Sequence, residues 1–259
     1  MSHLRWTLFL IFVAAARAQD PFEIHVYQYE SLEPGRFTLE QHLNYVSIGS
    51  KDFRGTVAPS NNQFHMTYEL TGGVTPNASL GVMLLTGEVP GGIGLQYAGW
   101  RILPHLYAPR TWSLPVDMGF VAEFSFQSTL FEENSRRVEL RPIVEKRIGD
   151  VMLTGNPVFE RALHGPGVGE GWHFEPAGRV GYQKYERFVP SVEYYGGLGP
   201  LRDVLPVNDQ QHSLYAGGDW KLGENLLWNF GVGVSATSAG DRLIFKSRLE
   251  FEFGRREHH

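Results

Sequence analysis

The sequence has no cysteine among its 259 residues, which excludes disulfides, thiolate metal sites and cysteine nucleophiles. It also has no large excess of one charge, since 20% of its residues are charged and the formal net charge is −5. So mild an imbalance gives no indication of a nucleic-acid partner, and none is expected. Glycine, with 30 residues, and the aromatic residues, at 13%, are by contrast plentiful, as in proteins with many strands and tight turns.

Long apolar runs are absent after the first twenty residues, so no membrane-spanning helix is expected there. The first twenty, MSHLRWTLFLIFVAAARAQD, have a short basic start ending at Arg5, an apolar run from Trp6 to Ala16 and an A-x-A site at residues 16–18. A membrane anchor is the weaker interpretation, because the run has about half the length that a spanning helix needs. We therefore predict a secretory signal peptide, residues 1–18, cleaved before Gln19.

Apolar and polar side chains alternate along the rest of the chain, which is the period of a β-strand with two different faces. In RLIFKSRLEFEFG (242–254), one face carries Leu243, Phe245, Leu249, Phe251 and Phe253, and the other Lys246, Arg248, Glu250 and Glu252. About twelve such strands are predicted, at 36–47, 62–73, 78–87, 94–106, 115–127, 136–147, 150–162, 171–183, 187–197, 211–221, 225–237 and 242–253. FEIHVYQYE (22–30) also alternates, as an extra strand or an extension of the first.

Strand length and loop length favour a barrel that spans a membrane over a soluble sandwich or lipocalin-like barrel, which is the alternative. The predicted strands have about ten to thirteen residues, whereas soluble strands have ~5–6 and membrane-crossing strands ~9–11. Most connections alternate between short turns and longer loops, as do the periplasmic turns and outer loops of bacterial outer-membrane barrels. We therefore predict an all-β fold, a transmembrane antiparallel up-and-down β-barrel of about twelve strands.

The prediction divides the mature chain into three parts. Residues 19–35 form an N-terminal periplasmic segment, residues 36–254 the outer-membrane barrel, and residues 255–259 a C-terminal tail. The last strand is expected to pair with the first, near Phe37 to Val46, and so to close the wall. The apolar faces then meet lipid and the polar faces line the lumen.

The predicted lumen carries charges of both signs, which must pair across strands or stay hydrated. A barrel of about twelve strands lies between barrels of about eight, filled by side chains, and of about sixteen, which leave an aqueous channel. The lumen is therefore either a narrow passage or a plugged core. The candidate lumen-lining and solute-binding residues, for which a structural ion-pair lattice is the alternative role, are Glu40, His42, His65, Glu69, Glu123, Arg141, Glu145, Glu175, Arg179, Glu193, Lys246, Arg248 and Glu250.

Other candidate chemistry is weak, and no catalytic residue is predicted. GPGVGEG (165–171) lacks the preceding parallel strand and the following helix of a phosphate-binding loop, and no G-x-S-x-G motif supports a hydrolase. His42 and His65 are expected to be neighbours across the first hairpin, with Glu40 and Glu69 nearby, a group that could bind a metal. We interpret them instead as hydrogen-bonded lumen residues and predict neither a metal nor a cofactor.

Several stretches carry a further likeness. In chain order these stretches are RPIVEKRIGD–VMLTGNPVFERAL, WHFEPAGRVGY, VEYYGGLGPL, QQHSLYAGGDWKLGENLLWNFGVGVS and DRLIFKSRLEFEFG. They resemble bacterial outer-membrane barrels grouped with the MetA-pathway phenol-degradation proteins. The resemblance covers residues 36–254. It implies an outer-membrane transporter, linked in that family to the uptake of small aromatic or hydrophobic compounds, and it implies no catalytic residues. Such barrels commonly end on an aromatic residue that the insertion machinery recognises, whereas here Phe253 is followed by GRREHH.

The leading hypothesis is a monomeric barrel in the cell outer membrane, surrounded by outer-membrane lipid, inserted by the barrel-assembly machinery, that passes or binds a small solute. One alternative is a structural or surface-interaction barrel that transports nothing, and the other is an outer-membrane hydrolase acting on lipid. The identity of the solute does not follow from the sequence, because lumen side chains select a solute only through their arrangement in space.

Overall fold

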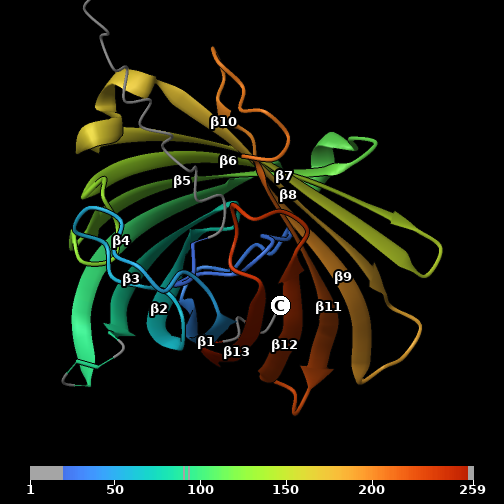
Figure 1. The fold of residues 1–259 in the computed structure, drawn as a ribbon. Coiled ribbons are helices and arrows are strands. Elements are labelled where there is room, and N and C mark those ends of the chain that lie inside the picture. The colour runs from blue at the N-terminus through green and yellow to red at the C-terminus, as the bar shows by residue number, and fades with distance from the viewer. Residues whose placement is uncertain (1–19, 90, 93, 256–259) are drawn as a thin grey trace, which may run out of the picture.

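The structure is a computed structural model that describes residues 20–89, 91–92 and 94–255. The predicted signal peptide and residues 256–259 of the predicted tail lie outside the described residues, so both assignments stay predictions. The chain forms a single sheet that closes on itself as a barrel (Figure 1). Among the described residues, no helix is long and apolar enough to cross a membrane.

The wall contains twelve strands. They are β1 (Arg36–Ile48), β2 (Gln63–Thr75), β3 (Ala78–Glu88), β4 (Leu95–Tyr107), β5 (Asp117–Gln127), β6 (Arg136–Ile148), β7 (Val151–His164), β8 (Trp172–Tyr182), β9 (Phe188–Gly197), β11 (Gln211–Lys221), β12 (Leu226–Ser235) and β13 (Leu243–Gly254). A further short strand, β10 (Gly199–Pro200), pairs with the start of β8. Every wall strand begins and ends within two residues of the predicted position, because the two-residue alternation is a local signal.

Two pairings close the wall. β1 pairs with β13 and β8 pairs with β9, so each wall strand has an antiparallel neighbour on both sides. In the seam between the first and last strands, Phe37 lies opposite Phe253 and Val46 lies opposite Ile244. The predicted fold, an all-β antiparallel barrel of twelve strands, is confirmed. Closure leaves no unpaired sheet edge among the described wall strands, which a membrane-spanning sheet requires.

The two faces of the wall differ in chemistry. Along β13, Phe245 and Phe251 are 43% and 47% exposed, whereas Lys246 and Arg248 are 6% and 4% exposed. The other strands also place leucine, valine and aromatic side chains outside, and their inner sides carry most of the charged and amide side chains together with apolar residues such as Met83 and Leu85. An apolar outer belt around a polar interior suits hydrocarbon rather than water. The fold and the belt together are those of an outer-membrane β-barrel.

The two rims of the barrel also differ. At the rim where β1 begins, here the short-turn rim, the connections after β2, β6, β8 and β11 are short. The connection after β4 is longer and contains a short 3-10 helix, η1 (Arg110–Trp112). At the opposite rim, here the long-loop rim, the loops 49–62, 128–135, 165–171 and 198–210 are long, and 165–171 contains η2 (Pro166–Glu170). Hydrogen bonds join neighbouring loops there, as between Ala58 N–H and the Leu130 carbonyl at 2.8 Å.

The N-terminal segment differs from the prediction. The sequence indicated a periplasmic segment over residues 19–35, but residues 20–33, here called the luminal segment, run through the inside of the barrel (Figure 1). Near the long-loop rim, Phe22 contacts Phe131 with ring centroids 5.5 Å apart. At the short-turn rim, the Ser31 hydroxyl donates to the Pro76 carbonyl.

The luminal segment forms no strand, although its alternation is that of one. The physical reason is that the wall is closed, so no edge is free to accept another strand. The alternation of the segment reflects its burial instead, because a chain inside the barrel contacts the wall on more than one side. Phe22, Ile24 and Val26 are each 3% exposed or less.

Candidate functional site: the lumen and its N-terminal segment

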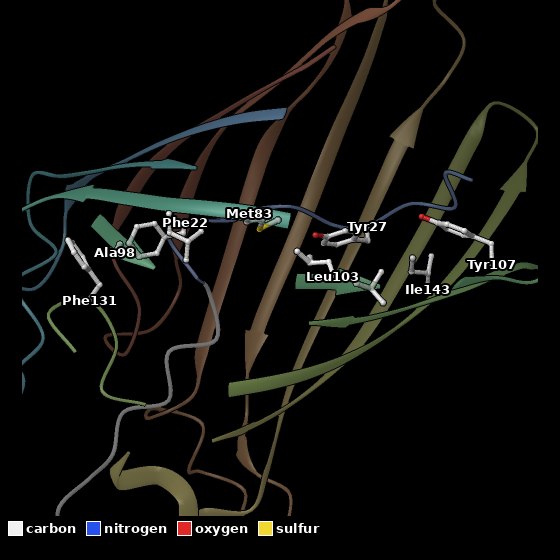
Figure 2. Packing of buried hydrophobic residues seen from close by; sticks show 10 residues of the cluster. Phe22, Tyr27, Met83, Ala98, Leu103, Tyr107, Phe131 and Ile143 are labelled. Carbon is white, nitrogen blue, oxygen red and sulfur yellow. The ribbon is translucent and has the colours of Figure 1, made fainter. Parts of the chain in front are cut away.

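Apolar side chains anchor the luminal segment to the inner wall in two clusters. Phe22 and Tyr27 pack in the first, shown in Figure 2, whose other buried members are Met83, Leu85, Ala98, Leu103, Tyr107, Val121, Phe131 and Ile143. Ile24 and Val26 pack in the second, with Val46, Tyr195, Tyr215 and Ile244. Full burial of one such side chain contributes about 1.5–3 kcal/mol. The luminal segment is therefore packed as part of the core.

Side chains of the wall bond to the backbone of the luminal segment, which has no strand partner. The side-chain amide of Asn156 on β7 bonds to both peptide groups of Tyr27, at 2.8 Å and 2.9 Å. Asn44 Nδ2 donates to the Pro21 carbonyl at 2.9 Å, and Lys246 Nζ donates to the Ile24 carbonyl at 3.4 Å. Buried peptide groups need such partners. These side chains supply the backbone hydrogen bonds that a neighbouring strand supplies in a sheet.

A buried group of charges holds the first residues of the luminal segment. Arg101 on β4, which has no exposed surface, pairs with Asp20, with Glu23 at 3.1 Å and with Glu123 of the wall at 3.2 Å. Arg137 on β6 also pairs with Asp20, at 3.0 Å. Removing one partner of a buried pair leaves an uncompensated charge and costs about 3–5 kcal/mol. These ion pairs therefore tie residues 20–23 to the wall.

A second group of charges lies on β8, β9, β11 and β13. Arg179 donates to Gln28 Oε1 of the luminal segment at 2.6 Å and pairs with Asp219. Lys246 pairs with Glu193 at 2.5 Å. The segment is thus bonded to opposite parts of the wall, and it divides the lumen.

A cavity of about 620 Å³ remains between the luminal segment and the wall towards the short-turn rim. Tyr27, Tyr29 and Glu30 of the segment line one side of it. Its wall side includes Glu40, Glu69, Thr71, Ser79, His105, Tyr107, Arg248 and Glu250. The next described cavity has only about 40 Å³. A space of several hundred cubic ångströms is typical of a small-molecule site, and this one lies in the short-turn half of the lumen.

The predicted lumen residues all lie with buried or half-buried side chains inside the barrel, but they fall into separate groups. Beside the large cavity lie Glu40, His42, Glu69, Arg248 and Glu250. The second group of charges contains Arg179, Glu193 and Lys246. Their ion pairs are present, and solute binding by any of them stays a prediction.

The remaining predicted residues have individual surroundings. Glu123 contacts Arg101, and the Arg141 guanidinium lies over the Tyr27 ring, 4.6 Å from its centroid. Glu145 accepts a hydrogen bond from Thr154 at 2.8 Å. His65 packs edge-on against Phe22, with ring centroids 4.6 Å apart. Glu175 lines the cavity of about 40 Å³.

The sequence reasoning missed the side chains that hold the luminal segment. Arg101 and Asn156 lie on the two predicted strands with the least regular alternation, so neither was singled out. Asp20 and Glu23 were assigned to a segment outside the barrel. The available signal was the alternation of residues 22–30, which indicated that this stretch is buried but not where.

Comparisons with known proteins agree with this architecture. No protein-family profile matches the sequence, and no curated protein matches it. Solved structures do match. The NanC porin has a TM-score of 0.57 and 7% identity over 85% of this chain and 100% of that chain. The COG4313 outer membrane channel from Pseudomonas putida F1 has a TM-score of 0.57 and 11% identity over 89% and 100%. The KdgM porin has a TM-score of 0.53 and 11% identity over 83% and 99%. At such identities the likeness is one of fold.

Proposed function

We propose that the protein is an outer-membrane channel for small solutes and that its luminal segment is the gate. The observation that carries the proposal is the cavity of about 620 Å³ beside a segment that belongs to no strand. A solute that enters from the short-turn rim reaches this cavity and then meets the buried part of the segment, from Phe22 to Val26. Passage to the long-loop rim requires that part to move.

The luminal segment suits this role because it can move without opening the wall. Its contacts with the wall are packing, ion pairs and side-chain hydrogen bonds, whereas the wall strands are joined by continuous ladders. These contacts can break without breaking any ladder hydrogen bond of the wall, so the barrel stays closed when the segment moves.

The solute class is the finer part of the proposal. The resemblance of residues 36–254 to the MetA-pathway phenol-degradation family indicates small aromatic or hydrophobic compounds. Tyr27, Tyr29 and Tyr107 on the cavity wall support this class, because their rings offer stacking surfaces. The proposed channel is a monomer inserted by the barrel-assembly machinery, and it performs no catalytic step.

Conductance in planar bilayers tests the channel. The full chain is expected to give small or infrequent openings, and a variant that lacks residues 22–30 is expected to give larger, long-lived ones. Heat-modifiable migration on a detergent gel, checked first for both proteins, establishes that each is a folded barrel. If neither protein passes current and proteoliposomes containing them take up neither phenol nor a small sugar, the barrel is structural and the proposal is wrong.

A further inference from the structure

Two carboxylates and one imidazole meet on the inner wall beside the large cavity. Glu40 and His42 are two residues apart on β1, so both face the lumen. Glu69 on β2 lies directly opposite Glu40 in the strand register. One donor atom from each of these three buried side chains lies within 4.8 Å of the other two.

The distances suit three ligands of one ion. His42 Nε2 lies 3.2 Å from Glu40 Oε2 and 4.0 Å from Glu69 Oε2. Ligand atoms bound to zinc at ~2.0–2.2 Å are about 3.3 Å apart when the geometry is tetrahedral. The 3.2 Å separation already has this length, the 4.0 Å separation is about 0.7 Å longer, and all three donors lie within 4.8 Å of one another.

His42 Nε2 provides the second observation. The His42 side chain is 2% exposed, and its Nε2 has no hydrogen-bond partner among the described residues. Although Glu40 Oε2 is near, the two atoms do not meet in hydrogen-bond geometry. A buried polar atom without a partner is costly, and a cation between the two atoms would satisfy both.

The charged side chains around the three donors include more carboxylates than cationic groups, which favours the binding of a cation. Arg248 pairs with Glu40 at 3.0 Å and with Glu250 at 3.3 Å. Glu69 accepts a hydrogen bond from the Thr71 hydroxyl at 2.7 Å and has no guanidinium or ammonium partner among the described residues. Among these side chains the carboxylates of Glu40, Glu69 and Glu250 outnumber the one guanidinium, that of Arg248, and a bound cation would offset this excess.

We propose that Glu40, His42 and Glu69 bind one divalent transition-metal ion of the zinc class. An imidazole nitrogen with carboxylate oxygens is a donor set that zinc accepts, whereas calcium and magnesium take oxygen ligands only. The cavity of about 620 Å³ gives access, because Glu40 and Glu69 line it. His25 of the luminal segment also lines it and has its ring 6.4 Å from that of His42. The site goes beyond the proposed channel function and does not depend on it.

Metal analysis of the folded, full-length protein tests the site. Every sample carries His258→Ala and His259→Ala, which removes the two terminal imidazoles as competing ligands. The protein is treated with a chelator, loaded with zinc chloride and desalted. One equivalent of zinc per chain is expected, with calorimetric titration giving the affinity and with magnesium chloride giving no comparable binding. His42→Gln and Glu69→Gln are expected to weaken zinc binding by more than about tenfold, since even outer-shell partners of a metal contribute about 10- to 100-fold.

His105→Gln is the matched control. His105 is a buried histidine on the wall of the same cavity, outside the three-donor group, so this variant should keep its zinc. Loading the protein with Co²⁺ gives an independent readout that needs no substitution of Glu40, His42 or Glu69, because the visible absorption bands of bound cobalt report its coordination. Loss of zinc in His105→Gln equal to that in His42→Gln would place the metal elsewhere. Zinc content near zero together with no cobalt bands would show that the three side chains form no metal site.

Discussion

The side-chain amide of Asn156 forms two hydrogen bonds with the backbone of Tyr27. The Tyr27 N–H donates to Asn156 Oδ1 at 2.8 Å, and Asn156 Nδ2 donates to the Tyr27 carbonyl at 2.9 Å. Both residues are buried, and they are 129 positions apart in the chain. One wall side chain thus satisfies both peptide groups of a residue in the middle of the luminal segment.

Asn156→Ala should release the luminal segment. The substitution leaves the Tyr27 N–H and carbonyl buried without partners, which costs about 1–3 kcal/mol. If the segment is the gate, the open fraction in planar bilayers should rise by about tenfold, since 1.4 kcal/mol corresponds to a tenfold change in an equilibrium. The control is Ser247→Ala, because Ser247 accepts a hydrogen bond from Trp228 Nε1 at 2.8 Å, a contact within the wall. An equal rise in both variants would mean that general loosening of the barrel, and not release of the segment, is being measured.

Arg101→Met should destabilise the folded protein strongly. Arg101 is shared by Asp20, Glu23 and Glu123, and removing a buried cation from its partners costs about 3–5 kcal/mol. Urea unfolding in lipid vesicles measures this cost. Arg110→Met is the control, because the Arg110 side chain is 72% exposed and an exposed pair contributes at most about 1 kcal/mol. Similar unfolding midpoints for the two variants would contradict the buried network.

Phe120→Arg should test which face of the wall meets lipid. Phe120 lies on the outer side of β5, and an arginine near the bilayer midplane costs about 2–4 kcal/mol. Glu123→Gln on the inner side should cost less, because Arg101 keeps Asp20 and Glu23 as partners. Urea unfolding in vesicles ranks the two. The reverse order would show that the faces are assigned the wrong way round.

Leu39→Cys with Phe251→Cys should form a disulfide across the closing seam. The two residues are directly opposite in the β1–β13 register, and both point outward. Opposed strand positions have Cα atoms ~4.5–5.5 Å apart, inside the range for a disulfide. Because the chain has no cysteine of its own, peptide mass spectrometry identifies the bond unambiguously. The control pair is Leu39→Cys with Phe245→Cys, since Phe245 is opposite Tyr45 and too far along the strand. A disulfide in the control but not in the test pair would mean that the register is wrong.

The strands and their faces were predictable because they depend on local sequence. A two-residue alternation determines which side chains share a face whatever the strand pairs with. For this reason the lipid-facing Phe245 and Phe251 and the inward Lys246 and Arg248 could be read from RLIFKSRLEFEFG. The pairing of β1 with β13 followed from closure, since a membrane-spanning sheet leaves no free edge.

The contents of the lumen were decided only by the tertiary structure. Arg101 points inward, and its partners Asp20 and Glu23 come from a segment that belongs to no wall strand. In the same way, the meeting of Glu40 with Glu69 depends on the register of β1 with β2. The path of residues 20–33 depends on the size of the closed barrel, because a tube of twelve strands has room for one extended chain and for a cavity beside it. By itself the sequence determined a barrel with an apolar outer surface and a charged inner surface. The three-dimensional packing determined which groups occupy the lumen.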